Sequence, residues 1–229
     1  MQRIRVWDLP TRVFHWALVA AVATAFATAK AGYMEAHGWA GLTVLGLVVF
    51  RLAWGVVGST YARFATFVPG PRALLAYLRG PRADGAGHNP LGALSVLAIL
   101  GVLLLQATGG LFASDDSTFY GPLASLVSRD TTDLVSILHR QGELLVIALV
   151  VLHIAAIAWH QRVQKHDLLR PMITGDKQVD DPGARDAQGG GLLAFVLALA
   201  IALAAVWVAS GALLPPPPPP EALPPPPAW

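Results

Sequence analysis

Long apolar windows separated by polar segments dominate the pattern of this 229-residue chain. Each window is long enough for a helix to cross a hydrocarbon core about 30 Å thick. The five windows run roughly from Val13 to Ala29, Gly38 to Val57, Leu91 to Phe112, Ser136 to Trp159 and Leu192 to Leu214. Strand-like alternation over about ten residues does not recur, which favours helices over a membrane barrel. The pattern therefore predicts an all-α integral membrane protein.

Basic residues gather in alternate segments between these windows. Most of the 16 Lys and Arg residues precede the first span or lie in the links from span two to three and from span four to five. The positive-inside rule makes that side cytoplasmic, so we expect a cytoplasmic N-terminus and a periplasmic C-terminus in a bacterial inner membrane. Tryptophans near the predicted span ends fit an interfacial belt; they are Trp7, Trp16, Trp39, Trp54 and Trp159.

Composition removes several classes of function. The chain contains no cysteine, which excludes disulfides, thiolate zinc sites, iron-sulfur clusters and covalently attached haem. Its formal charge of +2 is small and its basic residues form no single stripe, so nucleic-acid binding is not expected. Any metal must be held by histidine, methionine or carboxylate.

Four histidines inside the apolar windows carry the main chemical signal. In "LHRQGELLVIALVVLHIAAIAWHQR", His139 and His153 are fourteen residues apart, so they point within about 40° of each other and about 21 Å apart along a helix. His15 is level with His153 near the inner surface, and His37 is level with His139 near the outer one. A lone membrane histidine can instead bond a neighbouring carbonyl or hydroxyl. Two matched pairs favour two haem b groups with bis-histidine ligation.

Other residues of the spans leave alternatives open. Arg51 lies near the inner end of span two and is a candidate cofactor-binding residue, through a haem propionate, or it snorkels to the interface. His88 is a loop residue or touches a propionate. His160 and His166 are interface residues or take part in proton or quinone chemistry. Glycines in spans two and three admit either a macrocycle or a neighbouring helix; they are Gly38, Gly41, Gly46, Gly101, Gly109 and Gly110.

Several segments resemble a known family. They are "RVWDLPTRVFHW", "HGWAGLTVLGLVVFRLAWGVVGS", "YARFATFVPGP", "GHNPLGALSVLAILGVLLLQATGG" and the His139 to His153 segment. These resemble the bacterial di-haem cytochrome b561 proteins, which are related to the cytochrome b subunits of nickel-iron hydrogenases, over residues 3 to about 177. The resemblance implies a four-helix transmembrane bundle that holds two haems and passes electrons between a quinone pool and a periplasmic partner. It also implies that the haem ligands, and thus the metal ligands, are His15, His37, His139 and His153.

Two features go beyond the resemblance. We expect residues 1–177 to form the di-haem domain, 178–191 a cytoplasmic linker, 192–214 one additional C-terminal transmembrane helix and 215–229 a proline-rich periplasmic tail. Consecutive prolines impose polyproline II at about 3.1 Å per residue, so the tail reaches at most about 46 Å.

The favoured function is a membrane electron carrier between quinone and a periplasmic redox protein. The acidic outer loop favours a basic partner, such as a c-type cytochrome. That loop carries Asp115, Asp116, Asp130 and Asp133. Lys30 and Arg140 form a candidate positive funnel for the alternative function, superoxide oxidation linked to quinone. A second alternative is an anchoring subunit of a larger respiratory or photosynthetic complex, and a third is a transporter with histidine proton relays. We expect quinone to react near the cytoplasmic haem.

Overall fold

The computed structural model describes residues 2–80, 86–117 and 119–215 of the chain. Within these residues, five helices are long and apolar enough to cross a membrane. They are α1 (Leu9–Lys30), α2 (Met34–Val57), α5 (Pro90–Gly110), α6 (Arg129–Arg162) and α8 (Leu192–Ala209). The predicted all-helical membrane architecture is therefore confirmed. The predicted proline tail, apart from Pro215, lies outside the described residues.

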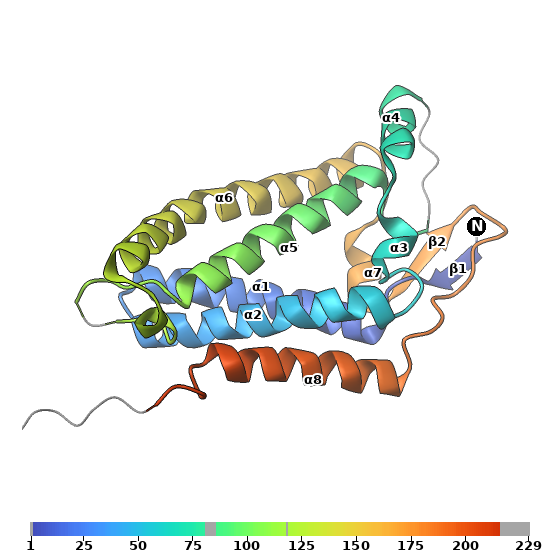
Figure 1. Ribbon diagram of the computed structural model, residues 1–229. Coiled ribbons are helices and arrows are strands. Elements are labelled where there is room, and N and C mark those ends of the chain that lie inside the picture. The colour runs from blue at the N-terminus through green and yellow to red at the C-terminus, as the bar shows by residue number, and fades with distance from the viewer. Residues whose placement is uncertain (1, 81–85, 118, 216–229) are drawn as a thin grey trace, which may run out of the picture.

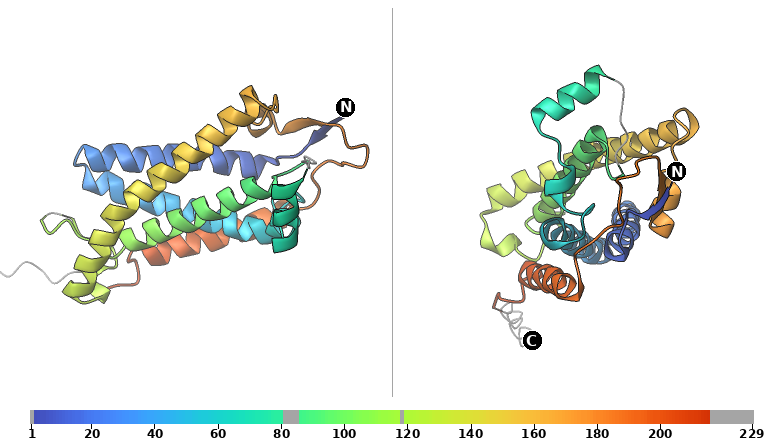
Figure 2. Two further views of the ribbon diagram at one scale, coloured as in Figure 1. Left: turned by 90° about the horizontal axis from the view of Figure 1, so that it is seen from above. Right: turned by 90° about the vertical axis from the view of Figure 1, so that its right-hand side faces the viewer.

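The five long helices run up and down, and each lies beside a small number of neighbours. Helix α2 packs against α1 on one side and against α5 and α8 on others, while α6 packs mainly against α5. Figure 1 shows α8 below α2, on the side away from α5 and α6. In the view from above, α6 crosses the bundle at a steep diagonal (Figure 2). Helix α1 is held in the bundle through α2, and α6 is held through α5, so α1 and α6 have no extensive contact with each other.

Shorter elements lie at the helix ends. They are β1 (Gln2–Arg5), α3 (Phe64–Phe67), α4 (Pro71–Arg79), the 3₁₀ helix η1 (Ala124–Leu126), α7 (Leu169–Thr174) and β2 (Asp176–Val179). Strands β1 and β2 pair antiparallel, with Gln2 opposite Val179 and Arg5 opposite Asp176. We call the end of the bundle that carries this sheet the sheet end, and the opposite end, with residues 111–128, the loop end (Figure 1).

Capping residues explain where three of the membrane helices begin. Asp8 accepts a hydrogen bond from the Thr11 amide at 2.7 Å and is followed by a proline in the first turn of α1. Asn89 does the same for α5 through the Gly92 amide, again with a proline following. Side-chain oxygens at this position satisfy otherwise unpaired helix amides, and proline fits the first turn because it has no amide to leave unpaired. Ser128 caps α6, so this helix starts seven residues before the predicted apolar window.

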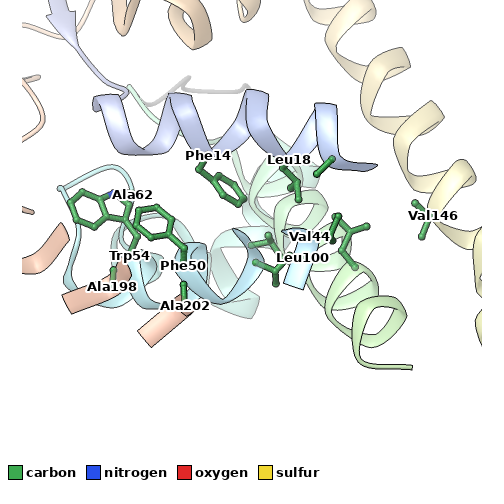
Figure 3. Close-up of a cluster of buried hydrophobic side chains, with 13 residues drawn as sticks. Phe14, Leu18, Val44, Phe50, Trp54, Ala62, Leu100, Val146, Ala198 and Ala202 are labelled. Carbon is green, nitrogen blue, oxygen red and sulfur yellow. The ribbon is translucent and has the colours of Figure 1, made fainter. Parts of the chain in front are cut away.

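The main core joins α1, α2, α5 and α8. Phe14 and Leu18 of α1 face the α2 side chains, among which Val48 is fully buried (Figure 3). On the other side of α2, Phe50 and Trp54 stack with their rings 6.0 Å apart. Small side chains on α8 lie next to these rings; they are Ala198 and Ala202. Lipid tails are as apolar as these residues, so close van der Waals packing rather than water exclusion holds the helices together.

The predicted linker between α6 and α8 packs onto the N-terminal segment. Strand β2 spans the expected boundary at 177/178, and Val179 is buried together with Ile4, Val6 and Trp7. Backbone bonds extend the contact: the Ala187 amide donates to the Arg5 carbonyl at 2.7 Å, and the Thr60 amide donates to Gln188 at 2.8 Å. The sheet end is thus closed by the N-terminal segment and the linker between α6 and α8.

Candidate functional site

At the loop end, the structure brings His37 of α2 and His139 of α6 together. Their ring centres are 6.0 Å apart and the ring planes are inclined by 74°. The two residues are separated by more than a hundred positions in sequence and meet across helices that pack mainly against other partners. This is the pair that sequence spacing assigns to the outer membrane surface.

Backbone carbonyls fix the protonation pattern of both rings. His37 Nδ1 lies 2.9 Å from the Ala25 carbonyl of α1, and His139 Nδ1 lies 3.0 Å from the Gln106 carbonyl of α5. A carbonyl oxygen can only accept, so each Nδ1 carries the proton and donates it. Each Nε2 then keeps its lone pair, which is the form of imidazole that ligates a metal.

The spacing of this pair suits a shared metal centre. Two metal–imidazole bonds of about 2 Å each, with about 1 Å from each nitrogen to its ring centre, add up to about 6 Å between ring centres. The observed separation of 6.0 Å agrees. Together with the tautomers, it means that the residues present fit a bis-histidine haem.

Gln106 is a contact of the pair that the sequence did not single out. The Gln106 side-chain amide donates to the His139 backbone carbonyl at 3.0 Å, while the Gln106 backbone carbonyl accepts from the His139 ring. Gly142 leaves space for it, because a Cβ there would collide with the Gln106 side chain. The available signal was a lone glutamine in an apolar helix, which needs a polar partner.

The glycines of spans two and three make room for different neighbours. A Cβ at Gly110 would lie 3.1 Å from the His139 ring, so this glycine makes room for a candidate ligand. A Cβ at Gly46 would lie 2.8 Å from Val206 of α8, so this one serves helix packing. Gly38 faces the Phe119 ring of the loop end in the same way. Gly41, one helical turn after His37, would have no protein atom within 4 Å of a Cβ.

The second histidine pair lies at the sheet end. His15 of α1 and His153 of α6 are both half-buried. The His15 ring lies edge-on to Trp16, with 5.0 Å between ring centres. Its Nδ1 is buried and has no hydrogen-bond partner. The sheet-end pair thus differs from the loop-end pair, because no carbonyl fixes the tautomer of His15.

Arg51 is buried by protein at the sheet end, where α2 meets α3. Its exposed fraction is 3%, and its guanidinium carbon lies 5.0 Å from the centre of the Phe64 ring. Among the described residues it forms no ion pair, and its Nη1 has no hydrogen-bond partner. Burying an unpaired cation is costly, so the snorkelling alternative does not apply and the side chain needs an anion.

His88 is part of the same end of the bundle. Its ring lies between those of Trp7 and Phe67, at 4.7 and 4.6 Å between centres, and its Nδ1 is buried without a partner. Burial, together with the charges of Arg51, Lys177 and His153, lowers the pKa of the His88 imidazole to about 3. His88 is therefore neutral at physiological pH.

The remaining predicted residues lie apart from the histidine pairs. His160 and His166 stack on each other with 6.4 Å between ring centres, where α6 ends. At the loop end, the Asp115 carboxylate accepts hydrogen bonds from the Ser117 and Phe119 amides, both at 2.9 Å. Asp115 is therefore a turn residue. The exposed aspartates of this end are Asp116, Asp130 and Asp133, and Glu35 in the first turn of α2 is exposed as well.

The candidate positive funnel at the loop end is partly neutralised. Lys30, at the end of α1, forms an ion pair of 2.6 Å with Glu143 of α6. This pair also joins the two helices that otherwise have no extensive contact. Arg140 is exposed on the same side.

Comparison with known proteins gives one match. The family described as prokaryotic cytochrome b561 matches residues 6–175, which is most of the chain. Neither the curated proteins nor the solved structures contain a match. The matched range includes all four paired histidines, Arg51 and His88, and it ends before α8.

Proposed function

Because the chain belongs to the prokaryotic cytochrome b561 family of haem b electron-transfer proteins of the bacterial membrane, we propose that it carries two haems and relays electrons between quinone and a periplasmic redox partner. His37 and His139 would hold the haem at the loop end, and His15 and His153 the haem at the sheet end. The observation that carries the proposal is the His37–His139 pair, with its 6.0 Å spacing and two proton-fixing carbonyls.

The chain's own residues supply geometry and insulation. When bound, haem b supplies a one-electron iron couple. With two histidines holding each haem, the iron would have no position open for oxygen. The Ala25 and Gln106 carbonyls orient the loop-end imidazoles and raise their basicity. Surrounding apolar side chains exclude water, so the proposed function is electron relay without ligand chemistry at the iron.

Haem stoichiometry tests this proposal directly. A pyridine haemochrome assay should give two haems per wild-type chain and one in His37→Ala or His139→Ala. His160→Ala is the matched control, since His160 lies in α6 outside both pairs, and it should retain two. One haem or none in the wild type would disprove the di-haem assignment. Equal loss in the His160 variant would show that haem loss reflects general damage to the helix.

The distribution of positive charge supports a cytoplasmic sheet end and a periplasmic loop end. The absence of cysteine from the sequence makes this testable with single introduced thiols. In intact cells, a membrane-impermeant maleimide should label Asp116→Cys and leave Arg185→Cys unlabelled until the cells are opened. The reverse pattern would invert the proposed direction across the membrane.

For the periplasmic partner, we favour a basic redox protein over superoxide. The exposed carboxylates at the loop end repel an anion and attract a basic surface. Pairing of Lys30 with Glu143 further weakens the positive field that superoxide would need. The proposed quinone site lies near the sheet-end haem, where His160 and the basic segments of that end can supply protons.

A further inference from the structure

Buried polar atoms without a partner are concentrated at one end of the molecule. Among the described residues, all of them lie at the sheet end; they are Thr11 Oγ1, Arg12 Nε, His15 Nδ1, Arg51 Nη1 and His88 Nδ1. Buried polar groups in proteins are nearly always hydrogen-bonded, so such a cluster indicates a polar ligand. The His15 atom belongs to the proposed sheet-end haem site, whereas Arg51 and His88 have no assigned role.

No carboxylate of the described chain is available to Arg51. The nearest charged group that acts on it is Asp8. One oxygen of Asp8 accepts from the Thr11 amide at 2.7 Å, and the other accepts from the Trp54 indole at 3.1 Å and from the Ser59 hydroxyl. Asp8 thus joins the start of α1 to the end of α2, and both of its oxygens accept hydrogen bonds from groups other than Arg51.

Phe67 links Arg51 to His88. Its ring centre lies 5.9 Å from the Arg51 guanidinium carbon and 4.6 Å from the His88 ring centre. Phe64 holds Arg51 from a second side and Trp7 holds His88. Both polar groups therefore contact the Phe67 ring, and the aromatic rings around them supply no hydrogen-bond acceptor. The low pKa of His88 means that it is a neutral imidazole with an N–H to donate.

We infer that Arg51 and His88 together form the binding site for a carboxylate, and that this carboxylate is a propionate of the sheet-end haem. A guanidinium presents paired donors that match a carboxylate, and a neutral imidazole adds one more donor. One cation and one neutral donor balance one negative charge, which removes the cost of burying Arg51 alone. His15, a proposed ligand of that haem, also has an unpartnered buried nitrogen at this end, so the carboxylate site and the proposed haem site adjoin. The inference rests on the proposed sheet-end haem.

Redox titration of the intact holoprotein tests the inference. Arg51→Gln removes the cation beside the propionate and leaves its negative charge to stabilise ferric iron. One of the two midpoint potentials should therefore fall, by about 59 mV for each tenfold change in the ferric-to-ferrous preference. His88→Phe should lower the same midpoint potential by less, corresponding to a several-fold change in the ferric-to-ferrous preference. His88→Asn, which keeps an N–H donor, should restore part of the potential. Arg51→Lys keeps the charge and should move the potential less than Arg51→Gln does.

Controls separate this effect from damage and from another anion. Arg72→Gln removes an exposed cation from the same end and should leave both potentials unchanged. Reconstitution with haem dimethyl ester, which lacks propionate charge, should abolish the difference between wild type and Arg51→Gln. If that difference persists with the ester, or disappears only when inorganic phosphate is removed, Arg51 binds an anion other than a propionate and the inference is wrong. A wild type with fewer than two haems would instead refute the proposed function, whatever the variants do.

Discussion

At the scale of single residues, hydrogen bonds to backbone carbonyls decide what the loop-end histidines can do. Histidine in a membrane helix has two nitrogens to satisfy, and a carbonyl acceptor satisfies one while leaving the other as a lone pair. Gln106 contributes twice, because its backbone carbonyl accepts from the His139 ring and its side-chain amide donates to the His139 backbone carbonyl. It therefore fixes both the ring and the backbone of this residue.

Replacing Gln106 by leucine should weaken haem binding at the loop end. The lost interhelical hydrogen bond is worth about 1 kcal/mol, which corresponds to about a fivefold loss of haem affinity. Transfer of haem to excess apomyoglobin would measure this loss. Thr43→Val is the control, because the Thr43 hydroxyl bonds only to the Trp39 carbonyl of its own helix. Equal transfer rates in wild type and Gln106→Leu would show that Gln106 does not support the site.

At the scale of elements, the fifth membrane helix is a packing partner of α2. Phe195 of α8 lies 5.8 Å from Phe50 and 6.3 Å from Trp54, between ring centres. Gly46 and the alanines of α8 allow the two backbones to approach. The helix thus covers the face of α2 that lies away from α6, and its position leaves the histidine pairs uncovered.

A larger side chain at Gly46 should separate α2 from α8. In Gly46→Val, the added atoms meet Val206, and overpacking of this kind destabilises by about 1–3 kcal/mol. Thermal unfolding in detergent should show a lower midpoint, while the content of haem stays at two. Gly101→Ala adds a methyl group where no atom lies within 4 Å and should not lower the midpoint. Haem loss in Gly46→Val without loss of stability would contradict this division of roles.

The small sheet depends on an ion pair that responds to pH. Hydrogen bonds and charge from Arg3, with a further contribution from Arg5, hold the pKa of Asp176 below its ordinary value. This stabilisation is present above the unfolded pKa of about 3.9 and is lost as pH falls through the lower folded value. Both arginines are largely exposed, so the effect is small and weakens with salt.

In Asp176→Asn, hydrogen exchange of the β1 amides should be faster than in the wild type at pH 7. After correction for intrinsic exchange, the difference should vanish as the pH is lowered through the folded pKa of Asp176, because the wild type then loses the same charge. A difference that is independent of pH would mean that Asp176 acts through its shape alone.

At the scale of the whole molecule, the two ends have different surfaces. The sheet end is closed by segments from β1, β2 and residues 180–190, which hydrogen-bond to one another and to the loop after α2. The loop end exposes carboxylates around the His37–His139 pair. A partner that exchanges electrons with the proposed loop-end haem would approach past these carboxylates.

Neutralising Asp116, Asp130 and Asp133 as asparagine should slow electron exchange between the loop-end haem and a basic c-type cytochrome. Asp115 is kept, because its carboxylate holds the turn. The effect should be large at 0.01 M salt, where the Debye length is about 30 Å, and small at 0.1 M, where it is about 10 Å. Stopped-flow spectroscopy at both salt concentrations measures it, with Asp167→Asn at the opposite end as control. With superoxide as substrate, the same substitutions should raise the rate, because an anion would no longer be repelled. An equal rate in the wild type and the variant would mean that these aspartates have no docking role.

The sequence alone determined that the chain is a helical membrane protein and roughly where its spans lie, and it predicted the contact between His37 and His139. These conclusions depend on apolar length and on the helical repeat, and both are local properties of the backbone. The polar first turns of α6 were missed because an apolar window does not detect them, although Ser128 marks the true start.

The tertiary structure decided which helices adjoin and which groups complete each site. It placed α8 on α2, gave His139 its partner Gln106, and brought His88 beside Arg51 through Phe67. Apolar helix surfaces are nearly equivalent in lipid, so neighbours are chosen by close packing between residues far apart in sequence. Hydropathy and spacing carry no record of that choice, which is why the candidate ligands were predictable and the residues that orient them were not.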